Sequence, residues 1–434
     1  MKPESSAALA LSITRRALLG ACGFSIPVAV AAPSLWRREA DQSQGRVASV
    51  QPEVYIDAPF KAGPFRTNQL KSPQPYTIGI PDESMILEAK KITFMGRAPG
   101  MKNVMLRIGP NWFPTKLTPD GSWSSEIDLT EHANGPFVFD VLSWDGSEGN
   151  FSININVRVH LFLVGGRDET PPVEVPAGHP AAGMALVWSD EFTDPLSTSS
   201  RRSRGAKWFQ GGKPEISEFG AAWFPDADEG RNPFYQRDGF LRIRAQHDPD
   251  LIDPFKWNRK WWSGFLSTGF PDGSASFEFR EGYVEVRMMC PLGQGPWPAF
   301  WLLDTGSTVK PNTGAVELDI IEHYGFEDAY QIAVHDWPPR LPDGKLDESK
   351  AAGELFFPQG DVTNKFHTFG CKLTRTEMIF YKDGIEQLRR PLYQAERVSS
   401  FYLMLNLALG GGWPVVVPPS GYYDLWIDYV RAYA

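Results

Sequence analysis

Residues 317–322 read Glu-Leu-Asp-Ile-Ile-Glu, and this alternation of acidic and apolar side chains is typical of a β-strand. Residues two apart in a strand lie on the same face, so Glu317 and Asp319 share one face while the apolar residues between them point into a core. Ile321 breaks the alternation, and Glu322 follows one position late. A one-residue β-bulge at the two isoleucines would return Glu322 to the acidic face, and bulges are common beside active sites. The pattern therefore predicts a bulged strand that presents three carboxylates on one face.

The same alternation recurs in short runs along the N-terminal part of the chain, between turns rich in Gly, Asp, Asn and Pro. We predict a small β-domain over residues 48–164, with strands at 103–108, 122–129, 137–144 and 153–164. This pattern resembles an immunoglobulin-like β-sandwich. Its residues Trp112 and Trp123 are candidates for a sugar-binding surface or for core positions.

A stretch rich in Pro and Gly, residues 165–183, follows this domain and is predicted to be a semi-stiff linker. Residues 184–434 again show an almost entirely β pattern. Their length, about 250 residues, fits a single large β-sandwich. We find no sustained helical periodicity outside the N-terminus.

The N-terminus has the features of an export signal. Arg15 and Arg16 precede an apolar run, and residues 29–31 (Ala-Val-Ala) form a small-residue cleavage site. The run is too short, and too interrupted by Gly and by Pro27, to predict a membrane span. We therefore expect residues 1–32 to be a twin-arginine-type signal peptide, and the mature protein to be secreted or periplasmic with no membrane span.

Net charge and aromatic content indicate which class of molecule the protein binds. The formal net charge of −9 argues against binding nucleic acid and is compatible with a neutral polymer. Eleven of the 15 Trp residues lie in residues 184–434. Aromatic rings pack against the C–H faces of sugar rings, while carboxylates bind their hydroxyl groups. Trp residues near an acidic strand therefore favour a polysaccharide as the substrate, and we expect the protein to be a monomer.

The three carboxylates suit one kind of chemistry. Four regular steps and a bulge separate the Cα atoms of Glu317 and Glu322 by roughly 13–15 Å. Inward-leaning side chains would bring the two carboxyl groups to about 5–6 Å, near the separation that retaining glycosidases use. Asp319 lies between them, so the three titrations would be coupled. The alternative from the pattern alone is a solvated acidic edge strand.

Other chemistries find little support in the sequence. There is no His-Glu-x-x-His pattern and no Cys/His spacing typical of a zinc site, so no metal and no cofactor is predicted for catalysis. There is also no Gly-x-Ser-x-Gly motif and no phosphate-binding Gly-rich loop. The basic segment 201–204 is expected to be solvated. Cys290 and Cys371 could form a disulfide or remain buried thiols.

Eight segments, in order along the chain, carry a resemblance to glycoside hydrolase family 16, the laminarinase and lichenase group. The acidic strand matches the bulged pattern Glu-x-Asp-x-x-Glu of this family. The matching segments are 188–192 (WSDEF), 282–287 (GYVEVR), 297–301 (WPAFW), 317–322 (ELDIIE), 367–370 (HTFG), 381–384 (YKDG), 406–411 (NLALGG) and 428–433 (DYVRAY).

The resemblance implies an all-β fold, a curved β-jelly-roll of two antiparallel sheets with a substrate cleft on the concave face. It implies that Glu317 is the nucleophile, Glu322 the general acid/base and Asp319 an assisting carboxylate. A structural Ca²⁺ occurs in some members of the family, but no ligands for it can be assigned here. The residues expected to bind substrate are Trp297, Trp301, His335, Trp337 and Trp413.

Residues 184–434 are therefore predicted to form a retaining endo-glycosidase. Its substrate would be a β-1,3-glucan, a mixed β-1,3/1,4-glucan or a bacterial exopolysaccharide like a β-glucan. Two alternatives remain open. One is a transglycosylase acting on the same polymers, and the other is a jelly roll that binds carbohydrate without catalysis.

Overall fold

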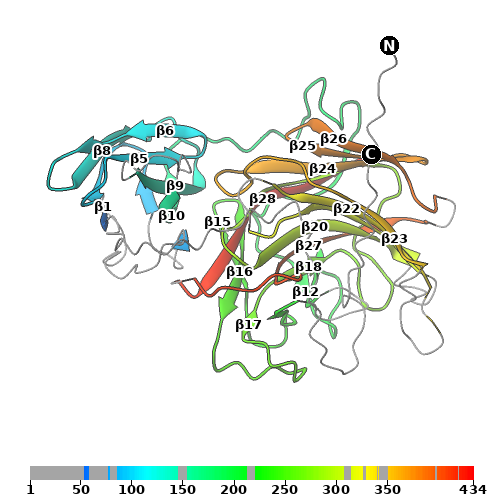
Figure 1. The fold of residues 1–434 in the computed structure, drawn as a ribbon. Coiled ribbons are helices and arrows are strands. Elements are labelled where there is room, and N and C mark those ends of the chain that lie inside the picture. The colour runs from blue at the N-terminus through cyan, green and yellow to red at the C-terminus, as the bar shows by residue number, and fades with distance from the viewer. Residues whose placement is uncertain are drawn as a thin grey trace, which may run out of the picture. The chain divides into compact units, whose positions relative to one another are not determined.

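The computed structural model describes residues 53–57, 77–78, 86–144, 154–212, 220–306, 314–325, 329–339, 341, 350–395, 398–418 and 420–434 (Figure 1). The predicted signal peptide, residues 1–32, lies outside these ranges. Among the described residues, no helix is long and apolar enough to cross a membrane. Two compact units divide between Glu169 and Thr170, and we call them the first and the second unit.

The first unit consists of two sheets that pack face to face. Phe94 in one sheet stacks on Phe139 in the other, with ring centroids 4.4 Å apart. The four predicted strands are confirmed as β5, β8, β9 and β10, with ends that differ by at most two residues. The sheet orders are β1-β4-β8-β7 and β2-β10-β9-β5-β6, with β3 also paired to β10. The strands are β1 Glu53–Asp57, β2 Thr77–Ile78, β3 Ile86–Glu88, β4 Lys91–Arg97, β5 Asn103–Ile108, β6 Asn111–Pro114, β7 Lys116–Leu117, β8 Ser122–Asp128, β9 Gly135–Trp144 and β10 Asn154–Val164.

The two tryptophan candidates of the first unit differ in exposure. Trp123 is 2% exposed and belongs to the core, so it cannot serve as a sugar-binding surface. Trp112 is 41% exposed, and the guanidinium carbon of Arg107 lies 5.7 Å from its ring centroid. Of the two, only Trp112 remains a surface candidate.

The second unit is formed by two large sheets, which Figure 1 shows as stacked layers. One has the order β14-β17-β16-β28-β19-β24-β25-β26, with β11 and β15 paired to it, and the other β12-β13-β18-β27-β20-β21-β22-β23. The strands are β11 Leu186–Asp190, β12 Thr198–Ser199, β13 Trp208–Gln210, β14 Ala222–Trp223, β15 Phe234–Arg237, β16 Phe240–His247, β17 Trp261–Trp262, β18 Phe265–Ser267, β19 Gly282–Met289, β20 Pro296–Asp304, β21 Ala315–Glu322, β22 Gln331–Trp337, β23 Ala352–Phe356, β24 His367–Leu373, β25 Glu377–Lys382, β26 Ile385–Pro391, β27 Phe401–Leu409 and β28 Tyr422–Tyr433.

Apolar side chains from both sheets fill the space between the two layers. Leu318 of β21 and Leu405 of β27 face this core from one sheet, and Val286 of β19 and Ile427 of β28 are buried with them from the other. Each such side chain stabilises the fold by about 1.5–3 kcal/mol when it is removed from water. The predicted all-β sandwich is confirmed. Strand β21 lies inside one of its two sheets, between β20 and β22.

Part of the predicted linker belongs to the second unit. Thr170 Oγ1 donates to Asp428 Oδ1 at 3.0 Å, Arg431 Nη1 donates to the carbonyl of Pro172 at 3.2 Å, and Lys372 Nζ donates to the carbonyl of Pro180 at 3.0 Å. The Pro- and Gly-rich composition predicted a semi-stiff linker over residues 165–183. From Thr170 onward the segment is instead hydrogen-bonded to the second unit.

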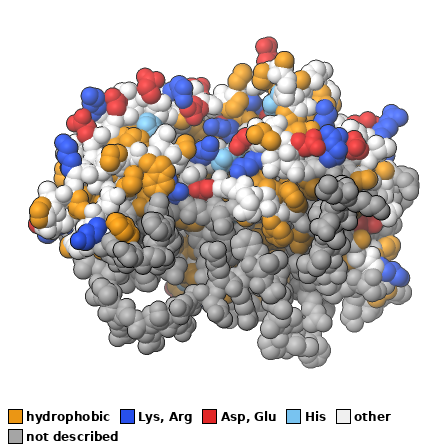
Figure 2. All heavy atoms as spheres, turned by 45° about the horizontal axis from the view of Figure 1, so that its top comes forward, with side chains coloured by type: hydrophobic (Ala, Val, Ile, Leu, Met, Phe, Trp, Pro, Cys, Tyr) orange, Lys and Arg blue, Asp and Glu red, His pale blue; other side chains and the backbone are white. Residues whose placement is uncertain are grey.

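Cys290 and Cys371 are both buried and free, which decides between the two possibilities that the sequence left open. Burial raises the pKa of both thiols. Acidic and basic side chains are interspersed over the face shown in Figure 2, so the net negative charge is not gathered into one patch there.

Candidate active site

The predicted β-bulge lies in strand β21. Glu317 pairs with His335 and Asp319 with Ala333 on β22, and the next paired residue is Glu322, opposite Gln331. The pairing with β20 shifts at the same place, because Trp301 lies opposite Asp319 while Ala299 lies opposite Glu322. The register shift between Asp319 and Glu322 confirms the bulge and puts all three carboxylates on one face of the sheet.

Three side chains hold the carboxylate of Glu322. Trp297 Nε1 donates to Glu322 Oε1 at 2.9 Å, and the Tyr324 hydroxyl donates to the same oxygen at 3.2 Å. Gln331 Nε2 donates to Oε2 at 2.5 Å. Glu322 is 2% exposed, so these bonds fix its orientation in a site from which bulk water is largely excluded.

A glycine allows the aromatic wall beside Glu322 to form. The Trp297 and Tyr324 rings stack with their centroids 5.7 Å apart. Gly411 packs against them with φ of +59°, and a Cβ there would lie 2.7 Å from Tyr324 and 2.9 Å from Trp297. Any larger residue would displace the stack, so Gly411 is required for the position of Trp297.

The other end of the acidic strand has a different set of partners. Trp337 Nε1 donates to Glu317 Oε2 at 3.1 Å, and the rings of Trp337 and His335 stack with centroids 4.9 Å apart. His335 Nε2 lies 3.4 Å from Asp319 Oδ2. Glu317 and Asp319 are therefore held by two rings that are themselves packed together.

Asp319 is the most perturbed of the three carboxylates. Burial, together with the charges of Glu322 and Glu317, raises its pKa to about 7, and His335 opposes this shift. At neutral pH the side chain can thus carry a proton. A neutral Asp319 relieves the repulsion between three adjacent carboxylates, and it can donate a hydrogen bond to a neighbour that must stay ionised.

The described residues contain one group with the geometry of a cation site. Its members are Glu317, Asp319 and His335, whose candidate ligand atoms all lie within 4.8 Å of one another. These residues coincide with the predicted catalytic carboxylates, and Glu317 already accepts a hydrogen bond from Trp337. The absence of a catalytic metal stays a prediction.

The remaining predicted site residues lie in different surroundings. Trp301, opposite Asp319, donates from Nε1 to the side-chain amide oxygen of Asn406 at 2.8 Å. Trp413 is 39% exposed on the segment between β27 and β28. Gln331 was missed in the sequence, because its position opposite Glu322 depends on the length of the turn between β21 and β22.

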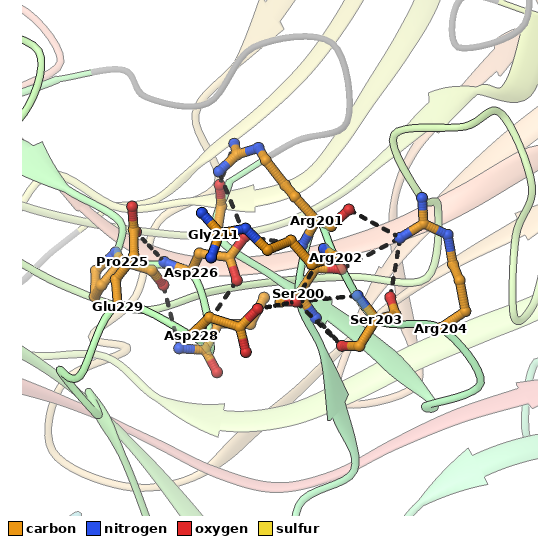
Figure 3. A network of polar contacts seen from close by, with 11 residues as sticks. Ser200, Arg201, Arg202, Ser203, Arg204, Gly211, Pro225, Asp226, Asp228 and Glu229 are labelled. Atoms are coloured by element: carbon orange, nitrogen blue, oxygen red, sulfur yellow. Dashed lines mark hydrogen bonds and ion pairs between the residues drawn. The ribbon is translucent and has the colours of Figure 1, made fainter.

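The basic segment 201–204 is tied to neighbouring acidic residues and carbonyl groups (Figure 3). The backbone N–H of Arg201 donates to Asp226 Oδ2 at 2.9 Å, and its Nη2 donates to the carbonyl of Gly211 at 2.9 Å. Arg204 pairs with Asp272 at 2.8 Å. These contacts anchor a surface loop and offer no cluster of uncompensated charge for an anion.

A cavity of about 390 Å³ lies next to this loop. None of the predicted site residues lines it. Its walls are formed by Leu196, Thr198, Gln210, Ala227, Arg231, Asn232, Phe234 and Gln236.

Comparisons with known proteins match a region that includes the acidic strand. Residues 258–414 match the family described as "Glycosyl hydrolases family 16". The chain is 31% identical over 208 residues to "Endo-1,3-1,4-beta-glycanase EglC" of Rhizobium meliloti (strain 1021), covering 47% of this chain and 40% of the relative. It is 29% identical over 269 residues to "Beta-glucanase" of Rhodothermus marinus, covering 57% of this chain and 84% of the relative.

A solved endo-beta-1,3-glucanase from Pyrococcus furiosus is 29% identical, with a TM-score of 0.44 over 58% of this chain and 94% of that chain. The chain spans only about two fifths of the length of some curated relatives that it matches.

Proposed function

We propose that the second unit belongs to glycosyl hydrolase family 16 and is a retaining endo-glycosidase that hydrolyses a β-linked glucan. The observation that carries this proposal is the bulged strand β21. It places Glu317, Asp319 and Glu322 on one face, with hydrogen-bond donors fixing both outer carboxylates.

The three carboxylates take different roles in this mechanism. Glu317 attacks the anomeric carbon and forms a covalent glycosyl-enzyme, while Glu322 protonates the departing glycosidic oxygen. Glu322 then removes a proton from the incoming water, which releases the sugar with its original anomeric configuration. Trp297, Tyr324 and Gln331 hold Glu322 for both steps. Asp319, whose raised pKa lets it carry a proton at neutral pH, removes one negative charge from beside Glu317.

The substrate class rests on the relatives and on the aromatic side chains around the strand. The relatives named above are a 1,3-1,4-β-glycanase and a β-glucanase. We therefore propose a β-1,3-glucan, a mixed β-1,3/1,4-glucan or an exopolysaccharide with such linkages. We further propose export by the twin-arginine route, since a glucan polymer must be cut outside the cytoplasm. We also propose that the protein acts as a monomer.

A panel of soluble glucans tests the proposal. The purified protein is incubated with β-1,3-glucan, mixed β-1,3/1,4-glucan, galactans and bacterial exopolysaccharides, and the release of reducing ends is measured. We expect release from at least one β-glucan, with oligosaccharides as early products. Chain-length redistribution without new reducing ends would indicate a transglycosylase. Retention of the protein on a glucan without any change in the polymer would indicate a binding protein.

A further inference from the structure

An exposed pair of aromatic rings lies outside the site described above. Phe255 and Trp257 are 40% and 47% exposed, and their ring centroids are 5.9 Å apart. Both belong to the segment between β16 and β17, which we call the 248–260 loop. In Figure 1 this loop is the green segment that leads into β17. Exposed rings of this size need a reason, because a soluble protein usually buries them.

The loop holds the two rings rigidly. Asp253 is 8% exposed, and its carboxylate accepts hydrogen bonds from the backbone N–H groups of Phe255, Trp257 and Arg259 at 3.0–3.2 Å. It also accepts two bonds from the Arg259 guanidinium, at 2.7 and 2.8 Å. Lys256 has a φ of +60°, a conformation that is costly for a residue with a side chain. Such strain persists only where the surrounding contacts enforce it, so the rings are preorganised.

Trp257 is 47% exposed, and Arg259 packs against its ring. The guanidinium carbon of Arg259 lies 4.6 Å from the Trp257 ring centroid and 5.5 Å from that of Phe255. Arg259 itself is buried, so it acts as the support beneath the rings. A sugar ring stacks on one face of an aromatic ring through its C–H groups, which is the contact that such a supported ring can offer.

Hydrogen bonds at both ends of the loop connect it with neighbouring segments. His247, at the start of the loop, donates its N–H to the carbonyl of Gly421 at 2.8 Å, at the end of the segment that carries Trp413. At the other end, Arg259 Nη1 donates to the carbonyl of Ala222 at 3.2 Å. The N–H of Ala221, next to Ala222, donates to the carbonyl of Leu409 at the end of β27, at 2.8 Å.

A chain of contacts thus connects Glu322 to the strand that precedes the 248–260 loop. Trp297 donates to the Glu322 carboxylate, Gly411 packs on Trp297, and Trp413 follows two residues later. The segment that carries Trp413 is hydrogen-bonded through Gly421 to His247, the last residue of β16 before the 248–260 loop. We propose that Trp257, with Phe255 beside it, is a distal sugar-binding subsite that stacks on a ring of the glucan chain beyond the cleft. The inference rests on the proposed function of the second unit.

The proposal is tested with Trp257→Ala in the full chain. For parent and variant, kcat/KM is measured on a short β-glucan oligosaccharide and on the polymer with the same linkages. A distal subsite affects only substrates long enough to reach it. We expect the ratio of the polymer value to the oligosaccharide value to fall about fivefold in Trp257→Ala, mainly through KM. Trp257→Phe keeps a ring in place and should keep the ratio within about twofold of the parent.

Ile252→Ala is the matched control, because Ile252 is 90% exposed on the same loop but has no ring. An equal loss in Ile252→Ala would show that the loop contacts a partner through general apolar surface, and this would overturn the proposal. An unchanged ratio in Trp257→Ala, with an active parent, would also overturn it. A loss of the same size on the oligosaccharide and the polymer would show that the loop only supports the cleft. If the parent cuts no glucan, the proposed function itself fails, which is a distinct outcome.

Discussion

Two aspartates, one in each unit, are almost completely buried, yet their surroundings give them opposite properties. Asp140 is 1% exposed in the first unit, and Asp319 is 2% exposed in the second. Arg158 binds both oxygens of Asp140 at 2.6 and 2.9 Å, and Arg107 binds one of them at 2.7 and 3.0 Å. Asp319 faces two further carboxylates and one histidine.

The pKa values follow from these partners. Burial alone would raise the pKa of Asp140, but the two arginines outweigh it and hold the pKa below its ordinary value. For Asp319, burial and the neighbouring carboxylates act together and raise the pKa to about 7. A buried carboxylate paired with arginines has its charge compensated, so that removing the charge from one partner destabilises the fold. One buried among carboxylates is costly for the fold and is expected where chemistry needs it.

The largest effect should come from removing either outer carboxylate of the Asp319 cluster. Glu317→Gln and Glu322→Gln should each lower kcat by at least about 300-fold while the melting temperature changes little, because nucleophile and acid/base act as one unit. Initial rates on the preferred glucan measure this. Glu377→Gln, a half-buried acid on β25 that pairs with Arg389, is the control and should behave like the parent. Near-normal turnover in either site variant would remove that residue from the mechanism.

Asp140→Asn should affect stability rather than chemistry. It leaves Arg158 buried without its ionised partner, which is expected to cost the first unit about 3–5 kcal/mol. Chemical denaturation followed by a probe in the first unit measures this loss. Glu88→Gln, at an exposed ion pair with Lys90, should change stability by less than about 0.5 kcal/mol. Equal stability of Asp140→Asn and the parent would contradict the role assigned to this cluster.

Asp319→Asn should give a smaller loss of activity, about 10- to 100-fold in kcat, and should remove an ionisation near pH 7 from the pH–rate profile. A profile with the same shape as the parent's would exclude Asp319 from the ionisations that control the rate.

The same substitution should stabilise the fold at high pH. The raised pKa means that the folded parent keeps a proton that an unfolded Asp loses near pH 4. This contribution to stability is complete below about pH 4 and is lost as the pH rises through 7. Asp319→Asn should therefore melt about 2–5 °C higher than the parent at pH 8, with a smaller difference at pH 5. A larger difference at pH 5 than at pH 8 would contradict the assigned direction of the shift.

The smallest effect concerns the independence of the two units. A chain that begins at Thr170 keeps the contacts of Thr170 and Pro172 with β28, and it should hydrolyse short oligosaccharides within about twofold of the parental rate. A chain that begins at Pro180 loses those contacts and should melt about 2–6 °C lower, at a similar rate of turnover. A collapse of activity in the Thr170 chain would show that the first unit contributes to the cleft.

Much of this arrangement could be predicted from the sequence. The strand periodicity of residues 317–322 required a bulge, because no regular strand puts Glu322 on the same face as Asp319. The hydrogen-bond partners of the carboxylates were harder to predict from the sequence. Gln331 reaches Glu322 through a pairing that depends on the turn before β22, and the arginines of Asp140 lie 18 and 33 residues away from it along the chain. The hydrogen bonds of Thr170 and Pro172 could not be predicted either, because composition does not show which residues of a Pro-rich segment bind to a neighbouring sheet.

The central claim is that Glu317 and Glu322 act as nucleophile and acid/base in a double displacement. Proton NMR of the first minutes of hydrolysis of the preferred β-glucan tests it most directly. The account predicts that the new reducing ends appear first as the β-anomer and change to the equilibrium mixture only later, by mutarotation. Initial appearance of the α-anomer would contradict the account, because it would require direct attack of water and two carboxylates farther apart than those of a retaining enzyme.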